Sequence, residues 1–333
     1  MQEIQSEIPE LTPKLPAGQH STITVILCTY NRAVALRKAL ASVAAQNAPS
    51  SATWEVLVVD NNSKDQTRAV VEDFCRRYPG RFRYLFEPRA GKSNALNAGL
   101  REARGGILAF IDDDVTAEPD WLENLTAPLH SGEWAGAGGR ILPEKSFSPP
   151  RWLSAHDRRA FAPLALFDLG PQPGPLAESP FGTNMAFRKE VFERFGGFRT
   201  DLGPRPDSII RGEDTEFGKR ILAAGLRLRY EPSAVVYHVM GENRTRKEYF
   251  LAWWFDKGRS DLRESGQPAG TRWVVAGVPF YLFRRFAIWT LRWMAAVEPA
   301  HRFYCKTQLR WLAGQIAESR QQARCAQPAT TGS

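Results

Sequence analysis

The sequence is poor in cysteine and has no long hydrophobic run. Its four cysteines are Cys28, Cys75, Cys305 and Cys325. They show neither zinc-ligand nor paired spacing, so we expect free thiols in a reducing compartment. No segment reaches the roughly 18 uncharged apolar residues that cross a bilayer, because the longest candidate, residues 273–283, ends at Arg284. Residues 1–20 are polar and lack the apolar stretch of a signal peptide. We therefore expect a disordered start and a cytoplasmic protein.

The first 245 residues also lack a net charge, with 30 Lys and Arg against 30 Asp and Glu. The whole excess of +8 lies in residues 246–324, which hold 14 basic and 6 acidic residues. A neutral body with a basic end indicates an anionic surface as partner. The same end holds six of the ten tryptophans: Trp253, Trp254, Trp273, Trp289, Trp293 and Trp311. Such bulky side chains exceed what a phosphate-tracking surface needs, so we expect an anionic membrane and no nucleic acid.

Residues 279–297 have the pattern of an amphipathic helix. At 100° per residue, Arg284, Arg285 and Arg292 fall within an arc of about 100°. The far side carries large apolar side chains: Leu282, Phe283, Phe286, Trp289, Trp293, Met294 and Val297. An apolar face opposite arginines predicts a helix that lies in the bilayer interface. The alternative is that this face packs on the protein's own core or on a dimer partner.

Apolar runs alternate with helical patterns over the first part of the chain. Strands are expected at residues 23–28, 54–60, 82–86 and 107–111, and helices at residues 33–46, 64–78 and 93–104. This order predicts an α/β fold with a mostly parallel sheet flanked by helices. Sheets of this kind bind ligands beyond the carboxyl ends of their strands. The polar clusters at residues 29–32, 60–63 and 112–114 should therefore line one cleft.

The regular pattern stops between about residues 142 and 180, a stretch rich in Pro and Gly. Long irregular segments inside a compact domain are often functional loops, so we expect a loop that faces the acceptor; an inert insertion is the alternative. Beyond it, strands are expected at residues 182–188, 226–230 and 234–237, with a short helix up to residue 195 and another at residues 213–224. We expect a catalytic domain over residues 21–245 and a basic, aromatic helical tail over residues 246–326.

Three consecutive carboxylates, Asp112, Asp113 and Asp114, follow the apolar run at residues 107–111. Adjacent acids repel one another, and such an arrangement persists when a cation holds it. Hard oxygen ligands favour Mg²⁺ or Mn²⁺ over zinc, and such an ion shares its remaining positions with substrate phosphates. The alternative is a solvated acidic turn that leads into a following helix.

Six segments, in order and at compatible spacing, resemble the family 2 glycosyltransferases, the inverting nucleotide-sugar enzymes of GT-A fold. The segments are residues 25–32 (VILCTYNR), 58–65 (VVDNNSKD), 91–97 (GKSNALN), 112–114 (DDD), 182–187 with 196–198 (GTNMAF and GGF), and 212–216 (GEDTE). The resemblance covers about residues 22–240. It implies an enzyme of bacterial cell-surface polysaccharide synthesis.

The resemblance implies a nucleotide site at the ends of the first two strands. Thr29, Tyr30 and Arg32 would flank the base and the ribose. Asp60 would accept the uracil imide N–H, which suggests a uridine nucleotide. The alternative for Asp60 is a turn residue that satisfies its own backbone.

The diphosphate and a metal ion are expected beside the triple aspartate. Lys92 begins a helix whose N–H groups and dipole favour phosphate, against the alternative of a solvated lysine. By resemblance, Asp112 contacts ribose or metal, Asp113 belongs to the nucleotide site, and Asp114 ligates the metal that bridges both phosphates. His238 would complete the metal or diphosphate site, unless it is only structural. The ion, Mn²⁺ or Mg²⁺, would assist departure of the nucleoside diphosphate as a Lewis acid.

Inversion at the anomeric carbon needs one carboxylate that deprotonates the acceptor hydroxyl. By resemblance Asp214 is this base, with Glu213 orienting the acceptor or serving as the alternative base. Both residues open a helix, so stabilisation of the helix dipole is the structural alternative. The segment Gly182, Thr183 and Asn184 is expected on the donor or acceptor sugar side, with a tight connection into a strand as the alternative.

The sequence therefore predicts a metal-dependent, inverting glycosyltransferase, peripheral at the inner face of the cell membrane. It would transfer a sugar from a UDP-sugar to a lipid-linked or glycan acceptor. The absence of a multi-pass segment favours single addition. Two alternatives are a non-enzymatic nucleotide-sugar-binding membrane adaptor and a sugar nucleotidyltransferase, although the segment after the first strand lacks the glycine-rich basic loop of the latter.

Overall fold

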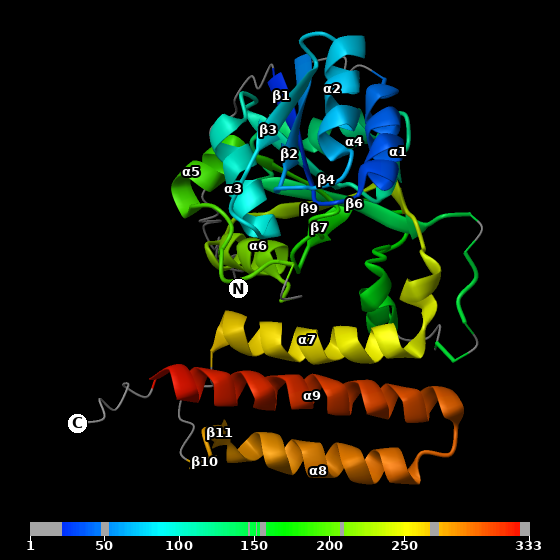
Figure 1. Ribbon diagram of the computed structural model, residues 1–333, viewed down its shortest axis with the longest axis vertical. Helices are drawn as coiled ribbons and strands as arrows, with labels where there is room; N and C mark the ends of the chain where they lie inside the picture. Colours follow the sequence, from blue (N-terminus) through cyan, green and yellow to red (C-terminus); the bar gives the residue numbers. More distant parts are fainter. Residues whose placement is uncertain are drawn as a thin grey trace, which may run out of the picture.

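The computed structural model describes residues 22–47, 53–145, 147–150, 152–153, 158–206, 210–266 and 273–326. An α/β body, in which helices flank one large sheet, lies above a stack of three long helices (Figure 1). The expected disordered start, residues 1–20, lies outside the described residues.

The first half of the sheet is parallel. β1 (Thr22–Thr29), β2 (Thr53–Asp60), β3 (Phe82–Phe86) and β4 (Ile107–Asp112) lie in the order β3-β2-β1-β4. Nearly every residue of β1, β2 and β4 is buried, as expected of parallel strands covered on both faces. In register, Thr29 pairs with Asp60 and Cys28 pairs with Asp112. The carboxyl ends of these strands therefore meet at one edge of the sheet.

The connections between these strands are α1 (Ala33–Ala44), α2 (Thr67–Arg77) and α3 (Lys92–Glu102). α1 buries Leu36, Leu40 and Val43 along one face, and α2 does the same with Val70, Val71 and Phe74. Burial of side chains of this size contributes about 1.5–3 kcal/mol each. The helical periodicity in the sequence thus sets which side of each helix meets the sheet, and the mostly parallel, helix-flanked α/β fold is confirmed.

The second half of the sheet is mixed. β8 (Asn184–Arg188) is antiparallel to β4, and β6 (Gly136–Pro143) is antiparallel to β8. β9 (Leu228–His238) runs parallel to β6, and β5 (Val115–Ala117) and β7 (Gly174–Leu176) are antiparallel to β9. The two strands expected at residues 226–230 and 234–237 thus form one strand. The remaining helical segments of the body are α4 (Trp121–Thr126), α5 (Lys189–Phe195), α6 (Glu213–Ala223), η1 (Ala127–Ser131), η2 (Arg158–Leu164) and η3 (Glu242–Thr245).

Strand β6 was not among the strands expected from the sequence. A β-carbon on Gly136 would overlap the Phe187 ring, and one on Gly139 would overlap the Ala234 carbonyl oxygen. These glycines therefore allow close packing between the strands.

An aromatic cluster attaches α5 and α6 to the sheet. Phe192 of α5 and Phe217 of α6 stack with ring centroids 4.5 Å apart, and Phe187 of β8 meets Phe217 edge-on at 5.0 Å. Because α6 begins with Glu213, this cluster fixes where the two acids of that helix lie.

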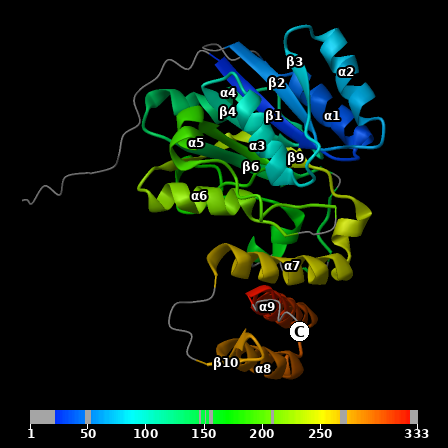
Figure 2. The same ribbon diagram turned by 60° about the vertical axis from the view of Figure 1, so that its left-hand side comes forward.

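The C-terminal helices are α7 (Lys247–Ser265), α8 (Phe280–Ala295) and α9 (Pro299–Ala326), and a small hairpin of β10 (Val274–Val275) and β11 (Val278–Pro279) precedes α8. In both views α9 lies between α7 and α8 (Figures 1 and 2). A β-carbon on Gly258 of α7 would overlap the Trp311 carbonyl oxygen of α9. The backbones of α7 and α9 therefore touch, and Arg259 and Arg263 of α7 both pair with the buried Glu318 of α9.

Part of the α8 face that we expected to meet a membrane packs inside the protein, whereas Met294 and Val297 of that face remain exposed. Leu282 is fully buried, and Phe283, Phe286 and Trp289 pack in the same cluster, which includes Leu312 of α9. The alternative of packing on the protein's own core applies to the packed part of this face, because Leu312 of α9 lies in the same cluster. Among the described residues, no helix combines the length and hydropathy of a membrane span.

Candidate active site

A cleft of about 1150 Å³ lies at the carboxyl edge of the sheet. It is lined by the end of β1, the start of α3, the end of β4, the start of α6, the end of β9, and one side of α7. Most of the expected site residues line it: Thr29, Tyr30, Arg32, Lys92, Asp112, Asp113, Asp114, Thr183, Glu213, Asp214 and His238. Side chains from distant parts of the sequence thus share one cavity.

Three expected residues are not among those that line the cleft: Asp60, Gly182 and Asn184. Asp60 is buried and accepts hydrogen bonds from the Tyr84 hydroxyl (2.8 Å) and the Ser63 N–H (2.9 Å). Gly182 donates its N–H to Asp214 Oδ2 at 2.7 Å.

The Asn184 side chain lies in the core beneath the cleft. It is fully buried, accepts from Trp121 Nε1 at 2.8 Å, and donates to the carbonyl oxygens of Arg140 (2.8 Å) and Ala234 (2.9 Å). Its amide thus joins three parts of the fold, a structural role that supports the neighbouring Thr183 in the cleft.

The three consecutive aspartates point to three different sets of partners. Asp112 accepts from Lys92 Nζ at 2.6 Å and from Thr183 Oγ1 at 2.7 Å. Asp113 accepts from Thr29 Oγ1 at 2.8 Å and from Arg32 at 3.0 Å. The mutual repulsion expected from the sequence is therefore relieved by nearby cations and hydroxyl groups.

Asp114, the third aspartate, has the most cations around it. Its carboxylate accepts from Arg32 (2.9 Å) and Arg244 (2.7 Å), and one oxygen lies 3.4 Å from His238 Nε2. Burial alone would raise the pKa of Asp114, but His238, Arg244 and Arg32 together hold it well below its usual range.

Burial and charge push the other titratable groups of the cleft in opposite directions. Burial raises the pKa of Asp113 to about 6, and the charge of Arg32 only partly opposes this. For Asp112, burial is outweighed by Lys92, which lowers the pKa of that carboxyl. Burial would lower the pKa of Lys92, but Asp112 and Glu213 raise it overall. Lys92 therefore remains a cation on the cleft wall.

The residues fit a divalent cation only after a rearrangement. Among the residues described, no group of three His, Cys, Asp or Glu side chains is arranged around a common metal position. Asp114 and His238 nevertheless adjoin, and the Arg244 guanidinium contacts both of them, at 2.7 Å from Asp114 Oδ2 and 2.8 Å from His238 Nε2. A positive charge thus already lies where these two donors meet, and oxygen and imidazole donors are both ligands of divalent metals.

The two acids at the start of α6 differ in their surroundings. Asp214 accepts from the Gly182 N–H and from the Thr215 N–H, each at 2.7 Å, which fixes the direction of its carboxylate. Glu213 is buried, and this burial, with the neighbouring charge of Asp214, raises its pKa to about 7 despite Lys92. One carboxyl of the pair therefore retains its proton close to neutral pH, and the other is oriented toward the cleft by the backbone.

Sequence reasoning missed several basic and aromatic residues from the second half of the chain that line the cleft. Arg244 of η3 and one side of α7, with Tyr249, Trp253 and Lys257, all line the cavity. The spacing of four residues shows that the α7 side chains share one face, but we had assigned that helix to the tail. The boundary expected at residue 245 therefore falls between two segments that line the same cleft.

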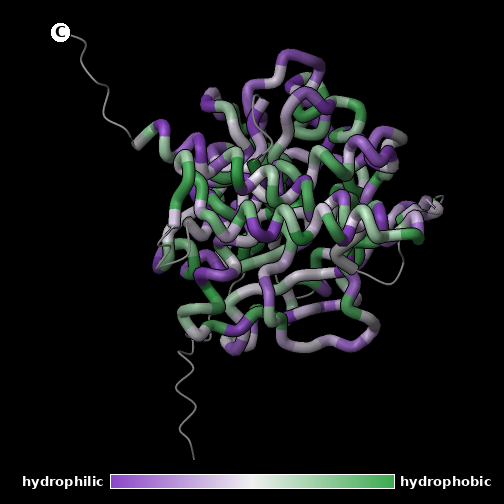
Figure 3. Tube along the Cα trace, turned by 90° about the horizontal axis from the view of Figure 1, so that it is seen from below, coloured by the Kyte–Doolittle hydropathy of each residue, from purple (hydrophilic) through white to green (hydrophobic). Residues whose placement is uncertain are grey.

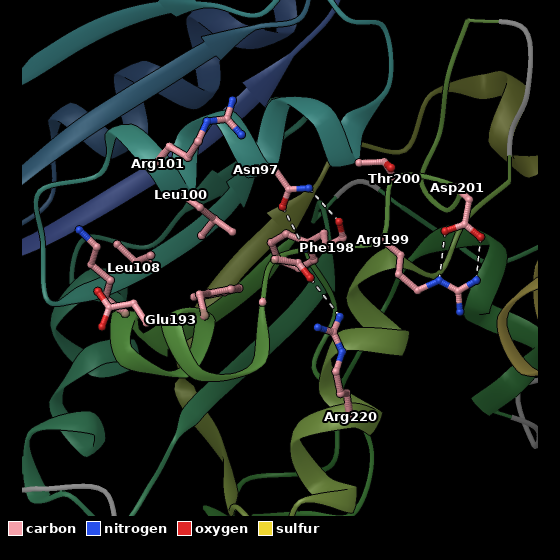
Figure 4. A pocket seen from close by; sticks show the side chains of 14 residues that line it. Asn97, Leu100, Arg101, Leu108, Glu193, Phe198, Arg199, Thr200, Asp201 and Arg220 are labelled. Carbon is pink, nitrogen blue, oxygen red and sulfur yellow. Dashed lines mark hydrogen bonds and ion pairs between the residues drawn. The ribbon is translucent and has the colours of Figure 1, made fainter.

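A second hollow of about 660 Å³ lies between α3, α5 and the loop at residues 196–201 (Figure 4). Two of its polar side chains bind the backbone of the loop. Asn97 donates to the Phe198 carbonyl oxygen and accepts from the Phe198 N–H, each at 2.8 Å. Arg220 donates to the Gly197 carbonyl oxygen at 3.0 Å and to Glu216. This hollow is a junction that ties two of the motif segments, residues 91–97 and 196–198, together.

The chain is similar to known glycosyltransferases in sequence. The sequence profile described as Glycosyl transferase family 2 matches residues 24–196. The succinoglycan biosynthesis protein ExoM of Rhizobium meliloti is 30% identical over 232 residues, covering 69% of this chain and 70% of that protein.

Two solved structures share the fold. The mannosyltransferase PcManGT from Pyrobaculum calidifontis, in complex with GDP-Man and Mn²⁺, has a TM-score of 0.54 at 21% identity, covering 97% of this chain and 80% of that one. Residues 1–349 of S. aureus TarS, in complex with UDP, have a TM-score of 0.51 at 16% identity, covering 92% and 93%.

Proposed function

This chain belongs to glycosyl transferase family 2, and from that premise we propose that it transfers one sugar from a uridine diphosphate donor to a hydroxyl group of a lipid-linked or glycan acceptor, with inversion. We further propose a role in polysaccharide biosynthesis, which the similarity to a succinoglycan biosynthesis protein supports. The observation that carries the proposal is the shared cleft, which the Glu213–Asp214 pair lines together with Lys92 and the three aspartates at the end of β4.

The donor diphosphate would bind among the cations of the cleft. Lys92 is held in place by Asp112 at 2.6 Å, and Arg32 and Arg244 converge on Asp114. Tyr30, which is 40% exposed at the cleft, offers an aromatic face to the base. We propose Asp60 for uracil recognition: it is buried next to Asn61, which lines the cleft, and each of its carboxylate oxygens keeps a second lone pair beyond its bond to Tyr84 or Ser63. The base would have to displace part of the cover over Asp60 to reach it.

A divalent cation, Mn²⁺ or Mg²⁺, would be held by Asp114 and His238, with Asp112 close by on the same edge. When bound, it would neutralise charge on the departing diphosphate as a Lewis acid. Its remaining positions would be filled by substrate phosphates or water, as is usual for such ions. One related fold was solved with Mn²⁺.

Asp214 would act as the base. Its carboxylate is oriented by the N–H groups of Gly182 and Thr215, and it lines the cleft that the acceptor would enter. A positioned base within hydrogen-bond reach of the hydroxyl can take its proton as the oxygen attacks. Glu213, whose pKa is raised to about 7 by burial, would orient the acceptor. It is also the alternative base. Thr183, which lines the cleft, would lie on the sugar side.

The proposal is tested with the purified full chain and a series of nucleotide sugars, incubated with Mn²⁺ and a lipid extract or glycan acceptor. We expect release of a nucleoside diphosphate with UDP-sugars, and loss of this release on addition of a chelator. Release of pyrophosphate instead would indicate a nucleotidyltransferase. Nucleotide-sugar binding without release, by the wild type and by Asp214→Asn alike, would indicate a binding adaptor.

A further inference from the structure

Exposed hydrophobic side chains gather on the side of α8 that faces away from α9. Among the described residues, eight of the large exposed ones lie between positions 273 and 297: Trp273, Val274, Val275, Phe280, Ile288, Leu291, Met294 and Val297. We call these eight residues the outer face. Trp273 is 77% exposed and Val297 is 94% exposed. Single exposed apolar residues are ordinary, whereas a contiguous group indicates an interaction surface.

The helical geometry places the α8 members of the outer face together. At 100° per residue, Met294, Phe280, Leu291 and Ile288 span an arc of about 120°, roughly opposite the buried Leu282. The hairpin of β10 and β11 adds Trp273, Val274 and Val275 at the start of the helix. Figure 3 looks onto this side of the molecule, from below in the orientation of Figure 1.

The charged side chains within residues 273–297 have one sign, and the first acid beyond this segment is the exposed Glu298. Residues 273–297 contain Arg284, Arg285 and Arg292 and no Asp or Glu. Arg284 falls within the apolar arc, and Arg285 and Arg292 both lie next to one edge of it. The guanidinium of Arg292 lies 4.8 Å from the Trp289 ring centroid, and that of Arg285 lies 5.2 Å from Trp311. The arginines are thus anchored beside the face rather than paired across it.

This combination favours a lipid surface over a second copy of the chain. A two-fold dimer would set the same patch against itself and would bring the Arg284 side chains of both copies close together. An apolar helix face with arginines suits the boundary between headgroups and acyl chains, where the arginines meet anionic lipid.

We propose that the outer face docks on a bilayer that contains anionic lipid. Leu291, Met294, Phe280 and the hairpin residues enter the interface, and Arg284 meets the headgroups. This inference concerns the tail alone and goes beyond the proposed transfer reaction, so it stands whichever donor or acceptor the cleft takes.

The test is flotation of the full chain with vesicles of phosphatidylcholine, with and without phosphatidylglycerol. We expect binding to the anionic vesicles. The variant Leu291→Glu with Met294→Glu, which changes two exposed positions, should lose at least about tenfold in vesicle affinity. The matched control is Val34→Glu, because Val34 is 80% exposed on α1, far along the chain; its vesicle binding should equal that of the wild type. Arg284→Gln should lose about fivefold in affinity for anionic vesicles, and this loss should be smaller in high salt.

Equal vesicle binding by the wild type and the double variant would overturn the proposal, as would failure of the wild type to bind anionic vesicles. Sedimentation without lipid adds an independent check, because a dimer that becomes a monomer in the double variant would identify the outer face as a contact between copies. Binding of UDP, measured by calorimetry on the same variants, should be unchanged. Failure of the sugar-transfer proposal is therefore distinguishable from failure of membrane docking.

Discussion

The position of Arg244 leads to a prediction about how the cleft binds a metal ion. Its guanidinium contacts Asp114 Oδ2 and His238 Nε2, the two groups that we assign to the ion. A divalent cation that uses both donors must first displace the arginine. The variant Arg244→Gln removes that competing charge and should therefore bind Mn²⁺ more tightly than the wild type in the absence of nucleotide.

The size of the effect follows from the contact. The pair is mostly shielded from water, with 24% of the Arg244 side chain and 15% of the Asp114 side chain exposed. A hydrogen bond to a charged group contributes about 1.5–3 kcal/mol. Arg32 still neutralises Asp114 in the variant, so we take the lower end of that range, which corresponds to about a tenfold gain in Mn²⁺ affinity.

The measurement is a titration of nucleotide-free protein with Mn²⁺, with the free ion followed by electron paramagnetic resonance. Arg246→Gln is the matched control, because it removes the same charge at an exposed position two residues further along. Its affinity should match that of the wild type. Unchanged or weaker Mn²⁺ binding by Arg244→Gln would refute the assignment of Asp114 and His238 to the ion.

Three further outcomes are expected. Asp214→Asn should keep nucleotide affinity but lower kcat by about 10² to 10⁴, measured as nucleoside diphosphate release; near-normal turnover would reject Asp214 as base. Glu213 has a folded pKa raised from 4.5 to about 7, so the folded state favours its protonated form and loses stability as pH rises through this window. Relative to Glu213→Gln, the wild type should lose about 3 kcal/mol between pH 4 and pH 8 in urea unfolding, and parallel pH profiles would contradict this. Gly258→Ala should destabilise the protein by about 1–3 kcal/mol through overlap with the Trp311 carbonyl oxygen, whereas Gly241→Ala, with open space around it, should be neutral in the same assay.

The parts of the fold that could be predicted are those encoded locally. The runs of Val, Ile and Leu in β1, β2 and β4 are each followed by polar residues, and parallel strands must deliver such residues to a common edge. Thr29, Lys92 and Asp112 therefore share a cleft, as expected. The inner faces of α1 and α2 followed in the same way from a period of 3.6 residues.

The parts that could not be predicted depend on partners far away in the sequence. The glycines of β6 make sense only beside Phe187 and the Ala234 carbonyl oxygen. Asp114 and Arg244 are 130 positions apart in the sequence, and a periodic pattern of residues cannot predict a pairing over such a distance. On α8, two faces are apolar, and the sequence alone could not tell which of them α9 covers.

The order of the last three helices sets the distance between the cleft and the outer face. α7 forms a wall of the cleft, α9 lies on α7, and the outer face belongs to α8 beneath them (Figure 2). Two helix-to-helix spacings of 8–10 Å separate that wall from the axis of α8, about 16–20 Å in all. An enzyme resting on its outer face would thus reach for hydroxyl groups well clear of the lipid headgroups. If the outer face rests on a membrane as proposed, this distance would favour as acceptor a glycan already several sugars long over the phosphate end of its lipid carrier.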